Sequence, residues 1–132
     1  MKLIYIAGPY RAASEWKLVQ NIRRAEALAL EVWHLGHACI CPHKNTALFG
    51  GAAPDELWLE GDLEILRRCD AVLCTDDWQR SVGACGEVGL ARSLEIPVFE
   101  SLDSLKTWLA EAVSTAAEES NSTPPPERAA TR

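Results

Sequence analysis

Short apolar runs alternate along the chain with longer segments in which apolar residues recur at helical spacing. The short runs are bounded by glycine, proline or polar residues, so they predict buried β-strands. The predicted strands cover residues 2–7, 38–41, 71–74 and 97–99. The longer segments predict helices over residues 14–35, 55–68, 84–94 and 103–113.

The segment 14–35 illustrates the helical pattern. Ser14 can cap the start of this helix with its side-chain oxygen, and Gly36 suits the turn that ends it. The apolar residues between them share one helical face, at Leu18, Ile22, Ala25, Leu28, Ala29 and Val32.

Strict alternation of strand and helix predicts an α/β fold with a doubly wound parallel sheet. We expect a single flavodoxin-like or Rossmann-like domain of four to five strands, with helices on both faces. Ligands bind such sheets at the carboxyl ends of the strands. Residues 43–54 follow one of these ends and predict a long loop, which in a compact domain is typical of functional segments.

The character of the sequence changes after residue 113. Residues 114–132 contain three consecutive prolines and no large apolar side chain. Such a segment cannot offset the entropy lost on ordering, so it predicts a disordered tail. The folded domain is therefore expected to span residues 1–113.

The charge balance limits the kinds of partner. With 19 acidic residues against 13 Lys and Arg, the formal net charge is −6. A protein that binds nucleic acid polymers needs a basic face, so this class of partner is excluded. A small phosphorylated ligand needs only one or two cations and some backbone N–H donors, and it stays compatible.

Targeting and cofactor signals are not evident in the sequence. The first apolar run stops at Gly8 and Pro9, which is too short for a signal peptide or a membrane span. Five cysteines without a C-x-x-C pair indicate reduced thiols in a cytoplasmic protein. The His and Cys spacings do not suit zinc, and no dinucleotide or P-loop motif is present, so we expect neither a metal nor a cofactor.

Glu87 is the first candidate for chemistry. It follows Gly83 and Gly86, which leave room for a ligand beside a single carboxylate. The competing interpretation is an acid in the first turn of a helix, where it would only complement the helix dipole. From the spacing alone, the two interpretations are evenly balanced.

Three further residues are candidates. Arg11, after the first predicted strand, could bind a phosphate or carboxylate, although a surface arginine is equally common there. Tyr5 is predicted to be buried, and its hydroxyl then needs a polar partner such as a carboxylate. Asp62 lies in an acidic stretch of a predicted helix, which more often forms a solvated face.

Four motifs in a fixed order point to a known family. They are Tyr5-Ile-Ala-Gly-Pro-Tyr-Arg11, Cys41-Pro-His43, the acidic and apolar stretch from Asp62 to Leu73, and Ser81-x-Gly-Ala-x-x-Glu87. With these motifs the chain resembles the nucleoside 2-deoxyribosyltransferase-like superfamily over residues 2–100, in its branch of the DUF4406 type. It is also similar to the nucleoside 5′-monophosphate N-glycosidases of that superfamily.

The resemblance implies a role for each matched residue. Glu87 corresponds to the nucleophile that attacks C1′ of the sugar, Tyr5 to the tyrosine that holds this carboxylate, and Asp62 to the acid that positions or protonates the leaving base. The substrate-binding residues implied by the resemblance are Gly8, Pro9, Arg11, His43, Ser81 and Gly83.

The resemblance leads to three hypotheses. The first is a cytoplasmic, homodimeric N-glycosidase that hydrolyses a nucleoside 5′-monophosphate, because Ser81 and Arg11 match the glycosidase pattern. The second is a nucleoside 2-deoxyribosyltransferase, in which a second base replaces water. The third is a domain that binds a nucleotide without turnover, since fold alone does not fix function.

Overall fold

Four short parallel strands in the order β2-β1-β3-β4 form the centre of the protein. The computed structural model describes residues 1–122, in two units that divide after Leu102. The strands are β1 (Leu3–Ala7), β2 (Ala38–Ile40), β3 (Ala71–Cys74) and β4 (Val98–Phe99).

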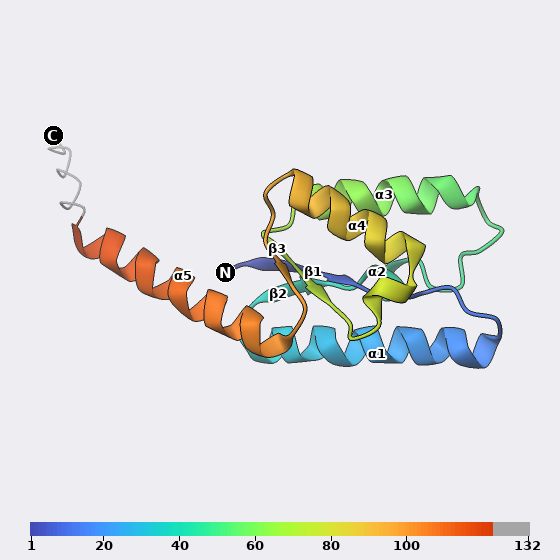
Figure 1. Ribbon diagram of the computed structural model, residues 1–132, viewed down its shortest axis with the longest axis horizontal. Coiled ribbons are helices and arrows are strands. Elements are labelled where there is room, and N and C mark those ends of the chain that lie inside the picture. The colour runs from blue at the N-terminus through green and yellow to red at the C-terminus, as the bar shows by residue number, and fades with distance from the viewer. Residues whose placement is uncertain (123–132) are drawn as a thin grey trace, which may run out of the picture. The chain divides into compact units, whose positions relative to one another are not determined.

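Helices cover both faces of this sheet, so the predicted doubly wound α/β fold is confirmed. In Figure 1, α3 and α4 lie over one face and α1 lies over the other. The helices of this unit are α1 (Glu15–His34), α2 (Pro42–Asn45), α3 (Asp55–Arg67) and α4 (Val82–Ser93), with a 3-10 turn η1 (Trp78–Arg80).

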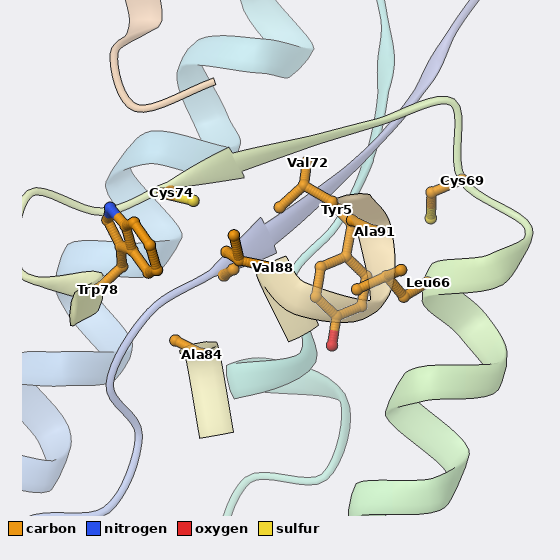
Figure 2. Close-up of a cluster of buried hydrophobic side chains, with 10 residues drawn as sticks. Tyr5, Leu66, Cys69, Val72, Cys74, Trp78, Ala84, Val88 and Ala91 are labelled. Carbon is orange, nitrogen blue, oxygen red and sulfur yellow. The ribbon is translucent and has the colours of Figure 1, made fainter. Parts of the chain in front are cut away.

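The two central strands alternate their side chains between the faces of the sheet. Tyr5 of β1 and Val72 of β3 point to the side of α3 and α4, where they join a buried cluster with Leu66 and Val88 (Figure 2). Burial of these apolar surfaces is the main force that fixes both helices on the sheet. The cluster therefore sets how β1, α3 and α4 lie relative to one another.

The strand order changes direction at β1. The chain passes from β1 to β2 on one side, and β3 then pairs with the other side of β1. In open α/β sheets the ligand site lies beyond the carboxyl ends of the strands at such a point. In this protein the relevant ends are Gly8 after β1 and Thr75 after β3.

Two boundaries differ from the predictions in ways that affect the site. The expected loop over residues 43–54 begins within a short helix, α2, because Pro42 suits a first helical position. Helix α4 begins at Val82 and not at residue 84, because the Ser81 side chain caps it. Glu87 thus lies in the second turn of α4, which weakens its interpretation as an acid that complements the helix dipole.

The last helix, α5 (Leu102–Ser122), is longer than predicted. Residues 114–122 were expected to be disordered, but they are helical, since this stretch contains Ala116, Ala117, Glu118 and Glu119, all good helix formers. The rest of the predicted tail, residues 123–132, lies outside the described residues. Within residues 1–122, no helix combines the length and the apolar character needed to cross a membrane.

Candidate functional site

Tyr5, Asp62 and Glu87 come from β1, α3 and α4 and lie close enough to act on one another electrostatically. Tyr5 is fully buried, and Figure 2 shows its ring beside Leu66 with the hydroxyl at the edge of the cluster. Asp62 precedes Leu66 by one helical turn, so both residues use the same face of α3. Glu87 precedes the buried Val88 on α4 and is itself partly buried.

Both carboxyl groups hold their protons more tightly than usual. Burial, and then the negative charge of Asp62, raises the pKa of Glu87 to about 8, and the Tyr5 hydroxyl offsets this rise in part. Burial raises the pKa of Asp62 to about 6. Within the described part of the chain, neither group forms an ion pair with a cation.

The Tyr5 hydroxyl is an available hydrogen-bond donor. Burial, followed by the charges of Glu87 and Asp62, raises its pKa, so the hydroxyl keeps its proton. Within the described residues it makes no hydrogen bond of standard geometry, although the Glu87 carboxylate is near enough to interact. A buried hydroxyl without a satisfied bond is costly, which is typical of functional sites.

This pair of carboxyl groups can supply a nucleophile and a proton from one place. Two acids that share a site and have raised pKa values exist as one acid and one carboxylate over a range of pH. For Glu87 and Asp62 the range lies between about 6 and about 8, and Glu87, with the higher pKa, is then the main holder of the proton. Attack by Glu87 therefore requires this proton to pass to Asp62 within the pair. The arrangement suits cleavage of a bond at a carbon that develops positive charge.

A second group of predicted residues surrounds the turn after β1. His43 is 5% exposed, and its Nε2 lies 3.0 Å from the carbonyl oxygens of both Gly8 and Pro9. Because carbonyls only accept, Nε2 carries the hydrogen and donates it to both. Burial lowers the pKa of His43 despite these two hydrogen bonds, so the ring is neutral.

The glycine at position 8 has a packing role. A Cβ atom there would lie 2.4 Å from the Thr75 Oγ1 atom, which is too close for any side chain. The resemblance implied that Gly8 is one of the substrate-binding residues. The space beside it is instead filled by Thr75, so glycine is required for contact between the ends of β1 and β3.

Arg11 and Ser81 are both engaged by other parts of the protein. The Arg11 guanidinium lies 2.9 Å from the carboxylate of Asp55, and both side chains are exposed. The Ser81 Oγ accepts a hydrogen bond of 3.1 Å from the backbone N–H of Ala84 at the start of α4. Gly83 is exposed beside Ser81.

Asn21 and Asp77 were not identified from the sequence. Asn21, within α1, donates to the backbone after β1, and Asp77, after β3, pairs with Arg24 of α1 and accepts from Thr75. Asparagine is a poor residue for a helix interior, so its position among the apolar residues of α1 was a usable signal. Asp77 carried no such signal, because aspartate is ordinary in turns.

An open groove of about 380 Å³ lies elsewhere, between α1, β2 and α2. Its walls include Leu30, Trp33 and Ile40, with Lys44 at the rim, and none of the three candidate catalytic residues lines it. Residues 1–122 contain no cluster of His, Cys, Asp or Glu placed to hold a metal ion.

Comparison with known proteins relates this arrangement to a family. The model for the domain of unknown function DUF4406 matches residues 2–100. A search of curated proteins finds no match to the chain.

Three solved structures have a similar fold. A 2-deoxyribosyltransferase from Bacillus psychrosaccharolyticus is 23% identical, with a TM-score of 0.53 over 73% of this chain and 69% of that protein. A 2-desoxiribosyltransferase from Leishmania mexicana is 18% identical, with a TM-score of 0.55 over 74% of this chain and 62% of that protein. A conserved protein from Enterococcus faecalis V583 is 21% identical, with a TM-score of 0.60 over 85% of this chain and 75% of that protein. The chain belongs to the DUF4406 family, and its fold is that of the nucleoside 2-deoxyribosyltransferases.

Proposed function

We propose that the protein is a nucleoside 2-deoxyribosyltransferase, which moves a deoxyribosyl group from one base to another. The observation that carries the proposal is the meeting of Tyr5, Asp62 and Glu87 from three separate elements, with raised pKa values at all three groups. The similarity in fold to two enzymes named as 2-deoxyribosyltransferases supports the same activity.

The proposed reaction has two balanced steps. In the first, a carboxylate oxygen of Glu87 bonds to C1′ as the bond from C1′ to the base breaks, and Asp62 gives its proton to the departing base. In the second, a nitrogen of the incoming base bonds to C1′, the ester to Glu87 breaks, and the proton of that base returns to Asp62. Tyr5 donates a hydrogen bond that orients the Glu87 carboxylate.

Hydrolysis of a nucleoside 5′-monophosphate is the second candidate. It needs only water in place of the incoming base, and Arg11 is the cation that would bind the phosphate. One contact favours an uncharged nucleoside over this substrate, because the charge of Arg11 is already paired with Asp55.

A base-exchange assay tests the proposal. The protein is incubated with a deoxynucleoside and a second free base, and the products are separated by chromatography. We expect an exchanged nucleoside, with activity lost in Glu87→Gln. Free base without exchange would instead indicate hydrolysis, and tight binding of an intact nucleotide in calorimetry without turnover would indicate a binding domain. If neither exchange nor release occurs, the enzymatic proposal is wrong.

We also propose that the active form is a homodimer. Exposed apolar side chains on α3 and at the start of α4 support this, since Leu57 is 55% exposed and Val82 is 91% exposed. Open space above Gly86 and Gly89 would let another helix approach α4 closely. Light scattering after gel filtration measures the mass, and a monomer at micromolar concentration would contradict this part of the proposal.

A further inference from the structure

Residues 8–11, which follow β1, are held by an unusual set of hydrogen bonds. This segment belongs to neither a helix nor a strand, so its backbone groups need partners elsewhere. The carbonyl oxygens of these four consecutive residues accept from just two side chains, His43 and Asn21. Two side chains thus bond to every backbone carbonyl of the segment.

His43 holds the first half of the segment. Its single Nε2 hydrogen is shared between the carbonyls of Gly8 and Pro9, at 3.0 Å each. The Nδ1 atom is buried and has no hydrogen-bond partner within the described residues. The ring faces the edge of Tyr10, with 6.1 Å between ring centroids. These contacts leave His43 little freedom to rotate.

Asn21 holds the second half. Its amide nitrogen has two hydrogens, and it donates to the carbonyls of Tyr10 at 3.1 Å and of Arg11 at 3.4 Å. The Tyr10 hydroxyl in turn accepts from the backbone N–H of Leu48 at 3.3 Å. The segment is therefore also tied to the long loop that follows α2.

The two donors lie on neighbouring helices that are linked to each other. Asn21 lies on α1, and His43 lies on α2, which is joined to α1 by an ion pair of 2.7 Å between Lys44 and Glu26. From the other side, Thr75 packs against Gly8. Residues 8–11 therefore lie between α1 and α2 on one side and the end of β3 on the other.

We infer that His43 and Asn21 are positioning residues, which hold residues 8–11 in a nucleoside-binding conformation at the carboxyl end of β1, where sheets of this kind bind their ligands. This inference rests on the proposed function and deepens it. The resemblance implied that His43 binds substrate. With Nε2 committed to two carbonyls, it acts through the Gly8–Pro9 turn. Asn21 acts in the same way through Tyr10 and Arg11.

Matched substitutions separate the two donors from general effects on folding. His43→Leu removes the donor, whereas His43→Gln keeps an N–H donor near the position of Nε2. Asn21→Asp keeps the shape but turns the donor into an acceptor that faces two carbonyls. Gln20→Glu, at the exposed neighbouring position on α1, is the control for the added charge.

The experiment measures amide hydrogen exchange, base-exchange kinetics and thermal unfolding for each variant. We expect His43→Leu and Asn21→Asp to speed amide hydrogen exchange across residues 8–11 about tenfold. Both should also raise the KM of base exchange about tenfold, with kcat changed less than about threefold. His43→Gln should recover most of both losses, and Gln20→Glu should match the wild type.

The outcomes separate this inference from the proposed function. The inference is overturned if amide hydrogen exchange across residues 8–11 is unchanged in Asn21→Asp. It is also overturned if His43→Gln raises KM and speeds hydrogen exchange as much as His43→Leu does. If His43→Leu does not fold, Asn21→Asp and His43→Gln still decide it. If the wild-type protein neither exchanges bases nor releases a free base, the proposed function is overturned. Amide hydrogen exchange alone then decides whether His43 and Asn21 hold the segment.

Discussion

The carboxyl groups in two regions of this small sheet behave in opposite ways. Between α3 and α4, Glu87 and Asp62 are partly buried without a cation, and burial raises the pKa of both. Beside α1, burial also raises the pKa of Asp77, but the hydrogen bond from Thr75 and the charge of Arg24 outweigh it, and the net shift is downward. The same chemical group is thus prepared for proton transfer in one region and for structural pairing in the other.

The difference lies both in burial, which is deeper for Glu87 and Asp62 than for Asp77, and in the partners. The acids on the paired side meet arginine, lysine or hydroxyl donors, whereas those between α3 and α4 meet a tyrosine and each other. An acid that keeps a raised pKa reduces the stability of the folded protein at neutral pH. Such a cost is retained where function needs it, so the comparison itself supports a catalytic role for the region between α3 and α4.

Removal of the Glu87 carboxylate should have the largest effect. In Glu87→Gln the nucleophile is gone while the shape is kept, so we expect base exchange to fall at least ~1000-fold. Glu64→Gln is the matched control, because Glu64 is an exposed acid on α3 that pairs with Arg67 and Arg68. It should change activity less than about twofold. Equal losses in both variants would abolish the distinction between the two kinds of acid.

The pH dependence of stability should have opposite signs in the two regions. The folded pKa of Glu87, about 8, lies above its ordinary value of 4.5, so its contribution to stability is full below 4.5 and is lost as the pH rises through 8. The free energy of unfolding of Glu87→Gln, relative to that of the wild type, should therefore rise on the order of 3–5 kcal/mol from pH 4 to pH 9.

Asp77→Asn should show the reverse behaviour. Its lowered pKa means that its contribution is present above the unfolded pKa and lost as the pH falls through the folded one. This variant should be less stable than the wild type at pH 7, and the difference should shrink in acid. Urea unfolding at several pH values measures both free energies, and parallel curves for the two variants would contradict the comparison.

Tyr5→Phe should separate function from stability. Loss of the hydroxyl removes the donor to Glu87, and we expect base exchange to fall about 30-fold. Because this hydroxyl makes no standard hydrogen bond in the described chain, the free energy of unfolding should fall by less than about 1 kcal/mol or rise. Chemical unfolding and steady-state kinetics test both halves. A large loss of stability would assign Tyr5 to the core alone.

The activity should follow a bell-shaped pH profile. Attack needs the singly protonated pair with its proton on Asp62, and this form is a constant fraction of the singly protonated pair at every pH. The pair gives up its two protons near pH 6 and pH 8. Beyond either limit kcat/KM should fall about tenfold per pH unit. Asp62→Asn should be slower and should lose the alkaline limb. A profile with the same alkaline limb in this variant would exclude Asp62 as the acid.

The exposed pair of Arg11 and Asp55 should give the smallest effect. Asp55→Asn frees the guanidinium, and we expect the preference for a nucleoside 5′-monophosphate over the nucleoside to rise about threefold in kcat/KM. Stability should change by less than about 1 kcal/mol, since both side chains are exposed. Competition between the two substrates measures the ratio. No change would show that Arg11 does not meet the phosphate.

Most of the fold could be predicted from periodicity, because buried strands and amphipathic helices each leave a repeating pattern. The errors fall where local chemistry decides. The cap at Ser81 moved the start of α4, and a stretch of alanine and glutamate extended α5 to Ser122. Neither effect depends on the apolar pattern, so periodicity alone could not find them.

The candidate site was less accessible to sequence reasoning. Glu87 stood out by its glycines, whereas Tyr5 and Asp62 were weaker candidates that received their roles from the family resemblance. Their proximity depends on how α3 and α4 pack on β1. The contact of Arg11 with Asp55 was not foreseeable, because it joins residues far apart in the chain and leaves no trace in local spacing. The position of Asn21 within a helix was a signal, but its two acceptors depend on how the turn after β1 folds back onto α1.

The contact of Thr75 with Gly8 has a consequence for access. In doubly wound proteins the crevice between the two strands at the switch point is the usual entrance for ligands. In this protein the Thr75 side chain fills the space directly beside Gly8, with no room for a Cβ atom on that residue. Under the proposed function, a nucleoside would therefore have to reach Glu87 without passing between Gly8 and Thr75.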